Sequence, residues 1–179
     1  METGVFMFGA VDSMKDAGSG PPAPTDRRFT QEEMWDAALK LIDMGVAAER
    51  LGFDVFQLTE HHFQHEGYEV VPNGLLFGVI LAERTKRIKI GAMFHIIPQW
   101  HPLRFAEDFA TLHNISGGRA ILGVGRGTVP REAQALGTQV GSFDNPDQAA
   151  ADVINREMMD EAMDVILTAY ENEEFSFHG

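Results

Sequence analysis

The sequence contains no cysteine, and this absence removes several classes of site at once. Without thiols there is no disulfide framework, no thiolate zinc site and no cysteine nucleophile. Basic residues are also few, because 14 Lys and Arg stand against 27 Asp and Glu, for a formal net charge of -13. A surface of that sign repels phosphate backbones and anionic lipid. We therefore expect neither a nucleic acid nor a membrane as a partner.

Long apolar runs are missing as well. No run approaches the roughly 20 residues that a membrane span needs. The N-terminus lacks a basic segment followed by an apolar one, so the sequence predicts no signal peptide. The remaining composition is ordinary, with 179 residues of which 44% are hydrophobic, enough for one sizeable core. Together these features predict an acidic globular protein of the cytoplasm.

Short apolar segments alternate with helical ones along the chain. Strands are predicted at 5–10, 55–59, 88–94 and 120–125, and the first is expected to be buried on both faces. Helices are predicted from the capping box at Thr30 to about Gly52, from Pro72, from Pro102 to about Ile115, and at 148–170. The last helix should bury Val153, Ile154, Val165, Ile166 and Ala169. This βαβαβαβα order predicts an α/β fold with parallel strands and helical crossovers.

The connections between these segments are unequal. The breaks from helix to strand are a few residues long, whereas the loops from strand to helix are long and rich in Gly, Pro, His and Arg. In an α/β protein the long loops lie at the carboxyl edge of the strands, where ligands bind. The groups at that edge include Glu60-His61-His62 and 125–128. By the same rule Ser116-Gly117-Gly118-Arg119, at an amino end, reads as structural, with Arg119 pinning the floor of the barrel.

The acid and histidines after the second strand allow more than one interpretation. His61, which titrates near neutrality, is favoured as a catalytic acid/base or a ligand-binding group. His62 and His65 also fit buried, hydrogen-bonded side chains without chemistry. Glu60-His61-His62 with His65 could hold a metal, although a loop does not fix ligand spacing as a helix does.

A glycine-rich stretch follows the fourth strand, at 123–128. It does not match a dinucleotide fingerprint, because Thr128 stands where the third glycine would be. Its glycines let a backbone pass close to a ligand. Arg126 offers a guanidinium fork to one phosphate or carboxylate. The alternative is a tight turn with Arg126 in a structural ion pair.

Three segments, Thr59-Glu60-His61-His62-Phe63, 101–108 and 116–127, together resemble the bacterial luciferase-like flavin-dependent monooxygenases. The similarity covers about residues 4–170, in the order and spacing of that family. It implies a (β/α)₈ TIM-barrel fold, of which residues 1–179 supply the N-terminal half, about the first four βα units. A complete barrel takes about 250 residues, so we expect the chain to be a fragment of a longer product, rather than a half that pairs with another chain or dimerises.

The resemblance also implies a chemistry. Reduced FMN and O₂ would oxidise a small organic substrate, with a flavin reductase as a further partner and a homodimer formed through the second and third helices. His61 would do acid/base work beside the flavin. The cofactor would lie against Glu60, Met93, Phe94, Arg126, Gly127 and Thr128, with a non-prolyl cis peptide at Met93-Phe94, and no metal is expected.

The sequence departs from the family at some positions and leaves other points undecided. Light-emitting members carry a reactive Cys where Gly125 stands, so luminescence is not predicted. Arg131 and Arg156 are the candidates for a second arginine on the phosphate. Two other functions remain alternatives: a deazaflavin-dependent oxidoreductase working by hydride transfer, and a flavin-binding or structural half-barrel without turnover. The substrate cannot be assigned, because such contacts lie on variable loops, here 11–29 and 128–147.

Overall fold

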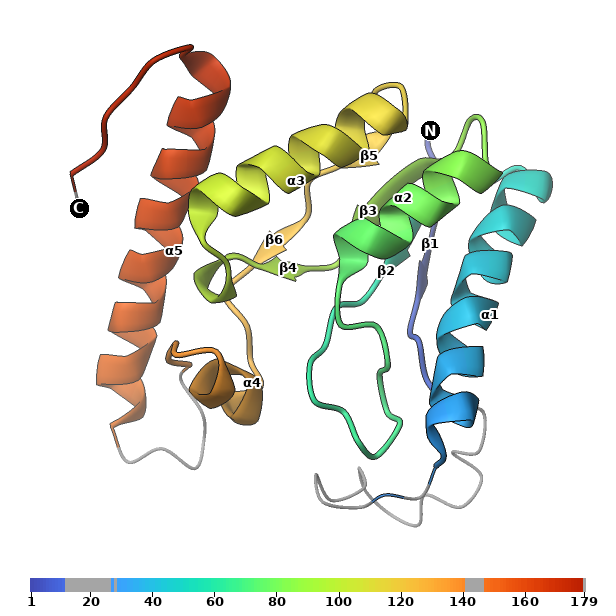
Figure 1. Cartoon of the computed structure of the whole chain (residues 1–179), viewed down its shortest axis with the longest axis horizontal. Helices are drawn as coiled ribbons and strands as arrows, with labels where there is room; N and C mark the ends of the chain where they lie inside the picture. Colours follow the sequence, from blue (N-terminus) through green and yellow to red (C-terminus); the bar gives the residue numbers. More distant parts are fainter. Residues whose placement is uncertain (12–26, 28, 141–146, 179) are drawn as a thin grey trace. The chain divides into compact units, whose positions relative to one another are not determined.

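The computed structural model describes residues 1–11, 27, 29–140 and 147–178. The chain divides into two compact units, which are described one at a time. Unit 1 comprises residues 1–94 and 112–123, and unit 2 comprises residues 95–111 and 124–179. Figure 1 follows the elements in chain order from blue to red. Among the described helices, none is long and apolar enough to cross a membrane.

Unit 1 is built on a four-stranded parallel sheet. Its strands are β1 (Gly4–Met7), β2 (Val55–Leu58), β3 (Lys89–Ala92) and β5 (Ala120–Ile121), in the order β1-β2-β3-β5. One row of the register runs from Val5 to Phe56, then to Ile90 and Ala120. Consecutive strands are therefore neighbours and parallel, which confirms the predicted βα architecture.

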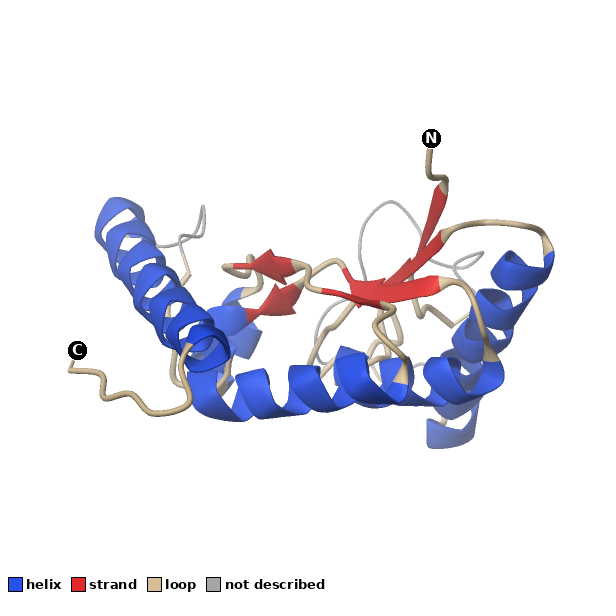
Figure 2. Ribbon diagram, turned by 90° about the horizontal axis from the view of Figure 1, so that it is seen from above, coloured by secondary structure: helices blue, strands red, loops and turns tan. Residues whose placement is uncertain are grey.

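Two helices of unit 1, α1 (Gln31–Arg50) and α2 (Gly74–Arg84), cover one face of this sheet (Figure 2). The core lies between them and the sheet, and its side chains are at most 1% exposed: Leu41, Ile42, Phe56, Leu58, Leu81 and Ile90. The expectation that the first strand is buried on both faces is wrong. Phe6 and Phe8 are 38% and 52% exposed, because the described helices of this unit cover the opposite face and β1 has a single neighbouring strand.

The ends of α1 and α2 are fixed by local hydrogen bonds. At Thr30 the predicted capping box is present: Glu33 N donates to Thr30 Oγ1 at 3.2 Å, and Thr30 N donates to Glu33 Oε2 at 2.8 Å. Helix α2 begins two residues later than Pro72, the predicted start. Asn73 is its N-cap and accepts a hydrogen bond from Leu76 N at 2.9 Å, which satisfies an amide that Pro72 cannot serve.

The fourth predicted strand is interrupted, and a further short strand follows the third one in a stretch predicted to be loop. β3 is followed by the two-residue β4 (His95–Ile96), and β5 by β6 (Val124–Gly125). Gly123 lies at the interruption, and an added Cβ there would collide with the carbonyl oxygen of Ala92. The two runs stay paired with each other, but the register of the β4–β6 pair is shifted by one residue from that of the β3–β5 pair, which the sequence pattern does not show.

Unit 2 is organised around the parallel pair β4 and β6. It also contains the 3₁₀ turn η2 (Ile97–Gln99), the first part of α3 (Pro102–Ile115), α4 (Pro130–Ala135) and α5 (Gln148–Glu171). The ring of Phe105 is fully buried and packs against His95, Trp100 and Phe109, with centroids 5.2–6.2 Å apart. The bounds of α3 agree with the sequence prediction, whereas α4 lies in a stretch predicted to be loop.

Helix α5 buries a narrower face than its sequence suggests. Val165 and Ile166 are buried as predicted, and Ala169 is half-buried. Val153 and Ile154 are 54% and 39% exposed, so the prediction that they belong to the core is wrong. The first half of α5 instead buries Ala151 and Asn155, because a polar cluster rather than an apolar core lies against it.

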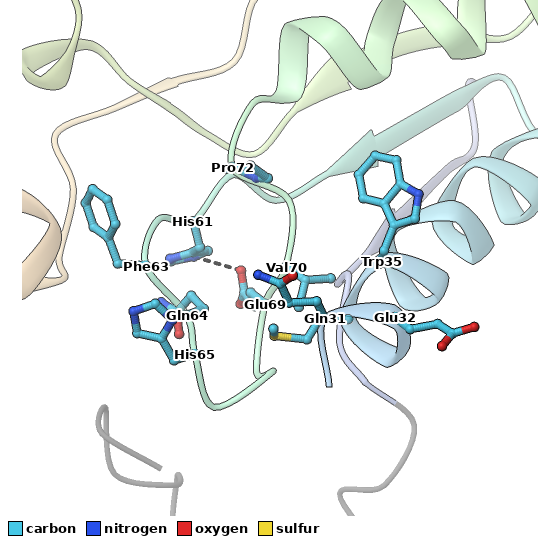
Figure 3. A pocket seen from close by; sticks show the side chains of 11 residues that line it. Gln31, Glu32, Trp35, His61, Phe63, Gln64, His65, Glu69, Val70 and Pro72 are labelled. Carbon is cyan, nitrogen blue, oxygen red and sulfur yellow. Dashed lines mark ion pairs between the residues drawn. The ribbon is translucent and has the colours of Figure 1, made fainter. Parts of the chain in front are cut away.

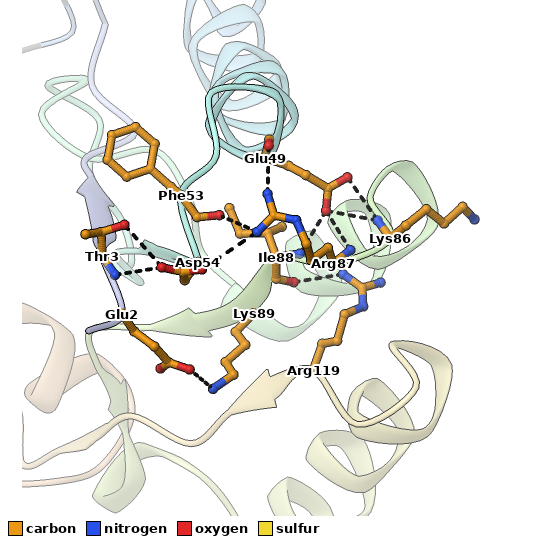
Figure 4. A network of polar contacts seen from close by, with 10 residues as sticks. All are labelled: Glu2, Thr3, Glu49, Phe53, Asp54, Lys86, Arg87, Ile88, Lys89 and Arg119. Atoms are coloured by element: carbon orange, nitrogen blue, oxygen red, sulfur yellow. Dashed lines mark hydrogen bonds and ion pairs between the residues drawn. The ribbon is translucent and has the colours of Figure 1, made fainter.

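The amino ends of the strands of unit 1 carry a network of polar contacts (Figure 4). Arg119 donates to the carbonyl oxygens of Ala82, Thr85, Ile88 and Ser116 at 2.7–3.2 Å. The guanidinium therefore joins the end of α2, the start of β3 and the turn before β5. The predicted structural role of Arg119 is confirmed, as a fork that satisfies otherwise unpaired carbonyls.

Candidate functional site

The acid at the end of β2 has a structural partner. Glu60 is 2% exposed, and its Oε2 accepts a hydrogen bond from Gly74 N, the first residue of α2, at 2.7 Å. A carboxylate at a helix N-terminus is stabilised by the unpaired amides and by the helix dipole. Glu60 thus fixes α2 to the carboxyl end of β2. A contact between Glu60 and a cofactor stays a prediction.

His61 turns its ring toward a second acid, Glu69. Nε2 of His61 lies 2.9 Å from Oε2 of Glu69, whose side chain is 4% exposed, while the imidazole itself is 25% exposed. Figure 3 shows the two side chains facing each other across the loop that links β2 to α2. One ring nitrogen of His61 is therefore placed against a buried acid, while a quarter of the imidazole stays exposed.

The other histidines of this loop do not gather into a metal site. Nε2 of His62 lies 3.9 Å from Oε1 of Glu60, and His65 lies at the rim of the pocket drawn in Figure 3. In the ranges that the structure describes, no group of three or more His, Asp or Glu side chains is placed to hold a metal ion.

The peptide bond between Met93 and Phe94 is cis, as the resemblance implied. It lies between β3 and β4, at the carboxyl edge of the sheet. Met93 N donates to Leu58 O at 2.8 Å, which ties this bond to the end of β2, two residues before Glu60. The ring of Phe94 is 46% exposed. Within unit 1 the structure therefore brings together Glu60, His61, Met93 and Phe94 at one sheet edge.

In unit 2, Arg126 is held by a polar cluster on α5. Its Nη1 donates to Oδ1 of Asp152 at 2.7 Å and to Oδ1 of Asn155 at 3.4 Å. The amide nitrogen of Asn155 returns a hydrogen bond to the carbonyl oxygen of Arg126 at 3.0 Å. Nη2 and Nε of Arg126 make no hydrogen bond within the described part of the chain. The guanidinium is oriented and keeps donors for a ligand.

Asp152 is shared between two arginines. Nη2 of Arg156 lies 2.8 Å from Oδ2 of Asp152, so the structure brings this candidate for a second phosphate arginine next to Arg126. Hydrogen bonds from the guanidinium of Arg126, and then of Arg156, lower the pKa of Asp152 from 3.8. Asp152 is therefore ionised at neutral pH and partly offsets the two positive charges.

Gly127 and Thr128 continue the chain from Arg126. Gly127 has φ +82°, and an added Cβ would lie 2.8 Å from Ile96 Cγ2, so a side chain is excluded on two grounds. Thr128 is exposed. The backbone next to Arg126 in the chain is thus bare of a side chain at Gly127. Contacts of these residues with a cofactor remain predictions.

Sequence reasoning missed three functional candidates: Glu69, Asp152 and Asn155. Glu69 lies in a loop without periodicity, and no pattern shows that it folds back to His61. Asp152 and Asn155 stand three residues apart on one face of α5, a spacing that marks a shared helix face. A buried Asn on an otherwise amphipathic helix is the signal that could have identified this cluster.

The whole chain, residues 1–179, matches the family model described as luciferase-like monooxygenase. One curated relative, limonene 1,2-monooxygenase of Rhodococcus erythropolis, is 37% identical over 108 residues, 60% of this chain and 27% of the relative. Across such relatives the chain spans less than half of their length.

Solved structures show the same fold. The oxygenating constituent of 3,6-diketocamphane monooxygenase from Pseudomonas putida, in complex with FMN, has a TM-score of 0.75 and 25% identity, and covers 100% of this chain and 43% of its own. An F420-dependent secondary alcohol dehydrogenase with an F420–acetone adduct has a TM-score of 0.68 at 20% identity, covering 100% of this chain and 46% of its own. Both structures are similar to this chain over less than half of their length, so the chain has the α/β fold of a partial TIM barrel.

Proposed function

Because the chain belongs to the luciferase-like monooxygenase family, we propose that it is part of a flavin-dependent monooxygenase that oxidises a small organic substrate with reduced FMN and O₂. The bound flavin supplies the activation of O₂. The observation that carries the proposal is Arg126, oriented by Asp152 and Asn155 with Nη2 and Nε left over. A guanidinium fixed on one side and open on the other fits a phosphate monoester.

The residues of unit 2 would hold the phosphate end of the cofactor. Arg126 would donate two hydrogen bonds to it, and Arg156 would add charge through their shared Asp152. The backbone of Gly127 and Thr128, bare of a side chain at Gly127, would pass beside the ring. In unit 1, Met93, Phe94 and Glu60, at one edge of the sheet, stay the predicted cofactor contacts of that unit.

His61 would move a proton to or from the substrate. Its ion-pair contact with the buried Glu69 would keep the ring in place for this proton transfer. The exposed quarter of the imidazole is sufficient for contact with a small molecule. The apolar side chains around it, Phe63 among them, would exclude water from the reacting groups.

The chemistry needs a source of reduced flavin. The P. putida neighbour is named as the oxygenating constituent of its enzyme, which supports a separate flavin reductase as a partner here. A homodimer through α2 and α3 is also proposed, with Leu76 of α2, 64% exposed, among the side chains it would cover. Light scattering during size-exclusion chromatography would test the dimer.

Cofactor binding is tested by titrating FMN with the protein and following flavin fluorescence. We expect Arg126→Gln to weaken FMN binding by at least tenfold, since it removes two charge-assisted hydrogen bonds. Arg104→Gln is the matched control, because Arg104 pairs with Glu107 and Asp108 on the surface of α3. Equal affinities of the two variants would remove Arg126 from the site. Binding of F420 in place of FMN would favour the hydride-transfer alternative.

The reaction class is tested with ¹⁸O₂ and enzymatically reduced FMN, with neutral terpenoids such as limonene as trial substrates. We expect one labelled oxygen atom in the product. Hydride transfer would leave no label. Among the histidines, His61→Ala should lower product formation by roughly 10²–10⁴-fold, the usual contribution of acid/base catalysis. His113→Ala, at the exposed end of α3, should serve as the control. Unchanged turnover in His61→Ala would end its catalytic assignment.

A further inference from the structure

A pocket of about 580 Å³ opens in unit 1 between the first turns of α1 and the loop from His61 to Pro72 (Figure 3). Its volume lies in the range of small-molecule sites. Trp35 on α1 and Phe63 on the loop supply aromatic faces, and they are 55% and 47% exposed. His61 and Glu69 lie on the pocket wall between them, so the pocket adjoins the proposed acid/base residue.

Phe63 is held in an unusual backbone conformation. Its φ is +59°, the one positive value among the described residues other than glycine. A bulky side chain rarely adopts this region, and such conformations gather at ligand sites. Two residues later, His65 N donates to Phe63 O at 3.0 Å, which stabilises the turn. The loop therefore presents an aromatic ring to the pocket at some conformational cost.

Glu69 is the polar feature that points to a ligand. Its side chain is only 4% exposed, yet Oε2 accepts no hydrogen bond of good geometry from the described residues. Nε2 of His61 is close, at 2.9 Å, as an ion-pair contact rather than an aligned hydrogen bond. A buried carboxylate oxygen without a donor is costly. A donor that enters the pocket would satisfy it.

The charge of the side chains that line the pocket determines which kind of hydrogen-bond donor a bound molecule can carry. Glu32 and Glu69 contribute carboxylates, and no Lys or Arg belongs to the described lining. Anionic molecules are therefore repelled, whereas a cation gains from both acids and from the faces of Trp35 and Phe63. Met34, Val70 and Pro72 complete an apolar wall for the body of the molecule.

We propose that this pocket binds a small organic molecule with an apolar body and a protonated amine, which donates a hydrogen bond to Glu69 and lies between Trp35 and Phe63. That the molecule is the substrate rests on the proposed monooxygenase function, because His61 is shared by both. The binding itself does not depend on flavin. A hydroxyl would fill the same place more weakly, and a carboxylate would be rejected.

The test uses Trp35 as an internal reporter. The sequence holds two tryptophans, and the second, Trp100, packs on Phe105 in unit 2, so a Trp100→Phe background isolates Trp35. Without flavin, this protein is titrated with 4-phenylbutylamine, 4-phenylbutan-1-ol and 4-phenylbutyrate at pH 7 and constant ionic strength. We expect the amine to bind at least tenfold more tightly than the carboxylate, with the alcohol between them.

Substitutions then locate the selectivity. Glu69→Gln should reduce the preference for amine over carboxylate to threefold or less. Should Glu69→Gln not fold, by circular dichroism, Glu32→Gln at the exposed rim should still weaken amine binding about two- to threefold. Glu83→Gln, at the far end of α2, is the control and should change nothing. No response of Trp35 to any ligand, equal affinity for the three, or a preference that survives the pocket substitutions would overturn the proposal.

The two proposals fail separately. Selectivity is measured in the absence of flavin, and FMN affinity is measured in the absence of the amine. Loss of amine selectivity with intact FMN binding would refute the amine site and leave the flavin function in place. Amine binding in a protein that does not bind FMN would refute the flavin function and leave the amine site in place.

Discussion

Glu49 is the side chain for which the structure gives the most specific prediction of how a substitution changes folding stability. Near the end of α1, its carboxylate accepts three consecutive amides of the turn before β3: Lys86 N at 3.1 Å, Arg87 N at 2.7 Å and Ile88 N at 2.8 Å. Burial raises the pKa of Glu49, but the amides of Ile88, Arg87 and Lys86 and the charge of Arg87 outweigh it and hold the pKa below 4.5. Glu49 therefore acts as the cap of this turn.

Glu49→Gln keeps the size of the side chain and changes what it can accept. One carbonyl oxygen can serve the two short contacts, and the new amide NH₂ then faces the Lys86 amide, donor against donor. Losing the charge-assisted part of these bonds costs about 1–3 kcal/mol. For a protein of this size that is roughly 3–9 °C in Tm. Glu83→Gln, an exposed replacement with the same change in charge, should cost less than about 0.5 kcal/mol.

The assay is urea unfolding followed by circular dichroism from pH 7 downwards. Because the folded pKa of Glu49 is lowered, its contribution is complete above the unfolded value of 4.5 and is lost as pH falls through the folded pKa. The difference between native protein and Glu49→Gln should therefore be full at pH 7 and shrink below pH 4.5. A Glu49 effect no larger than the Glu83 effect, or one that is unchanged in acid, would refute this reasoning.

Three further substitutions test packing and hydrogen bonding by the same unfolding measurement. Gly45→Ala should cost about 1–3 kcal/mol, because the added Cβ collides with the side chain of Leu81 between α1 and α2; a neutral result would show that this contact yields easily. Arg119→Lys should cost about 2–3 kcal/mol, since an ammonium cannot reach the carbonyls that the guanidinium joins, and stability within 0.5 kcal/mol of the native protein would contradict it. Tyr170→Phe removes a 3.0 Å hydrogen bond to Ala106 O and should cost about 1 kcal/mol. Burial raises the pKa of Tyr170 above 10.0, so this difference is full below pH 10 and should fall as pH rises through the folded pKa; a difference that grows in alkali would count against it.

The sequence was most informative where one periodicity extends over a whole element. Helix α3 was predicted with its observed bounds, because Pro102 starts it and the apolar spacing continues to Ile115. Helix α4 was missed, since its six residues, Pro130–Ala135, are too few for a periodic pattern. The interruption of pairing at Gly123 was also missed, because it depends on a carbonyl of the neighbouring strand some 30 residues earlier in the chain.

The residues of the candidate site also fall into those that the sequence predicted and those that it did not. Residue types at strand ends identified His61 and Arg126, whose positions follow from the order of the strands. Their partners Glu69 and Asp152 could not be predicted, because these contacts arise when a loop or a distant helix folds back. For Arg126 the sequence left a structural ion pair open beside phosphate binding, and the structure shows that the ion pair exists while leaving donors unused.

The hydrogen bond between Glu60 and Gly74 affects how substitutions of Glu60, in the segment 59–63 that resembles the family, should be interpreted. Replacing Glu60 would remove an acceptor from the first amide of α2, so the helix would fray whether or not the carboxylate touches a cofactor. A loss of activity in a Glu60 variant is thus ambiguous in origin. Hydrogen exchange at the amides of α2 would separate the two causes, because only the structural one accelerates exchange in the protein without cofactor.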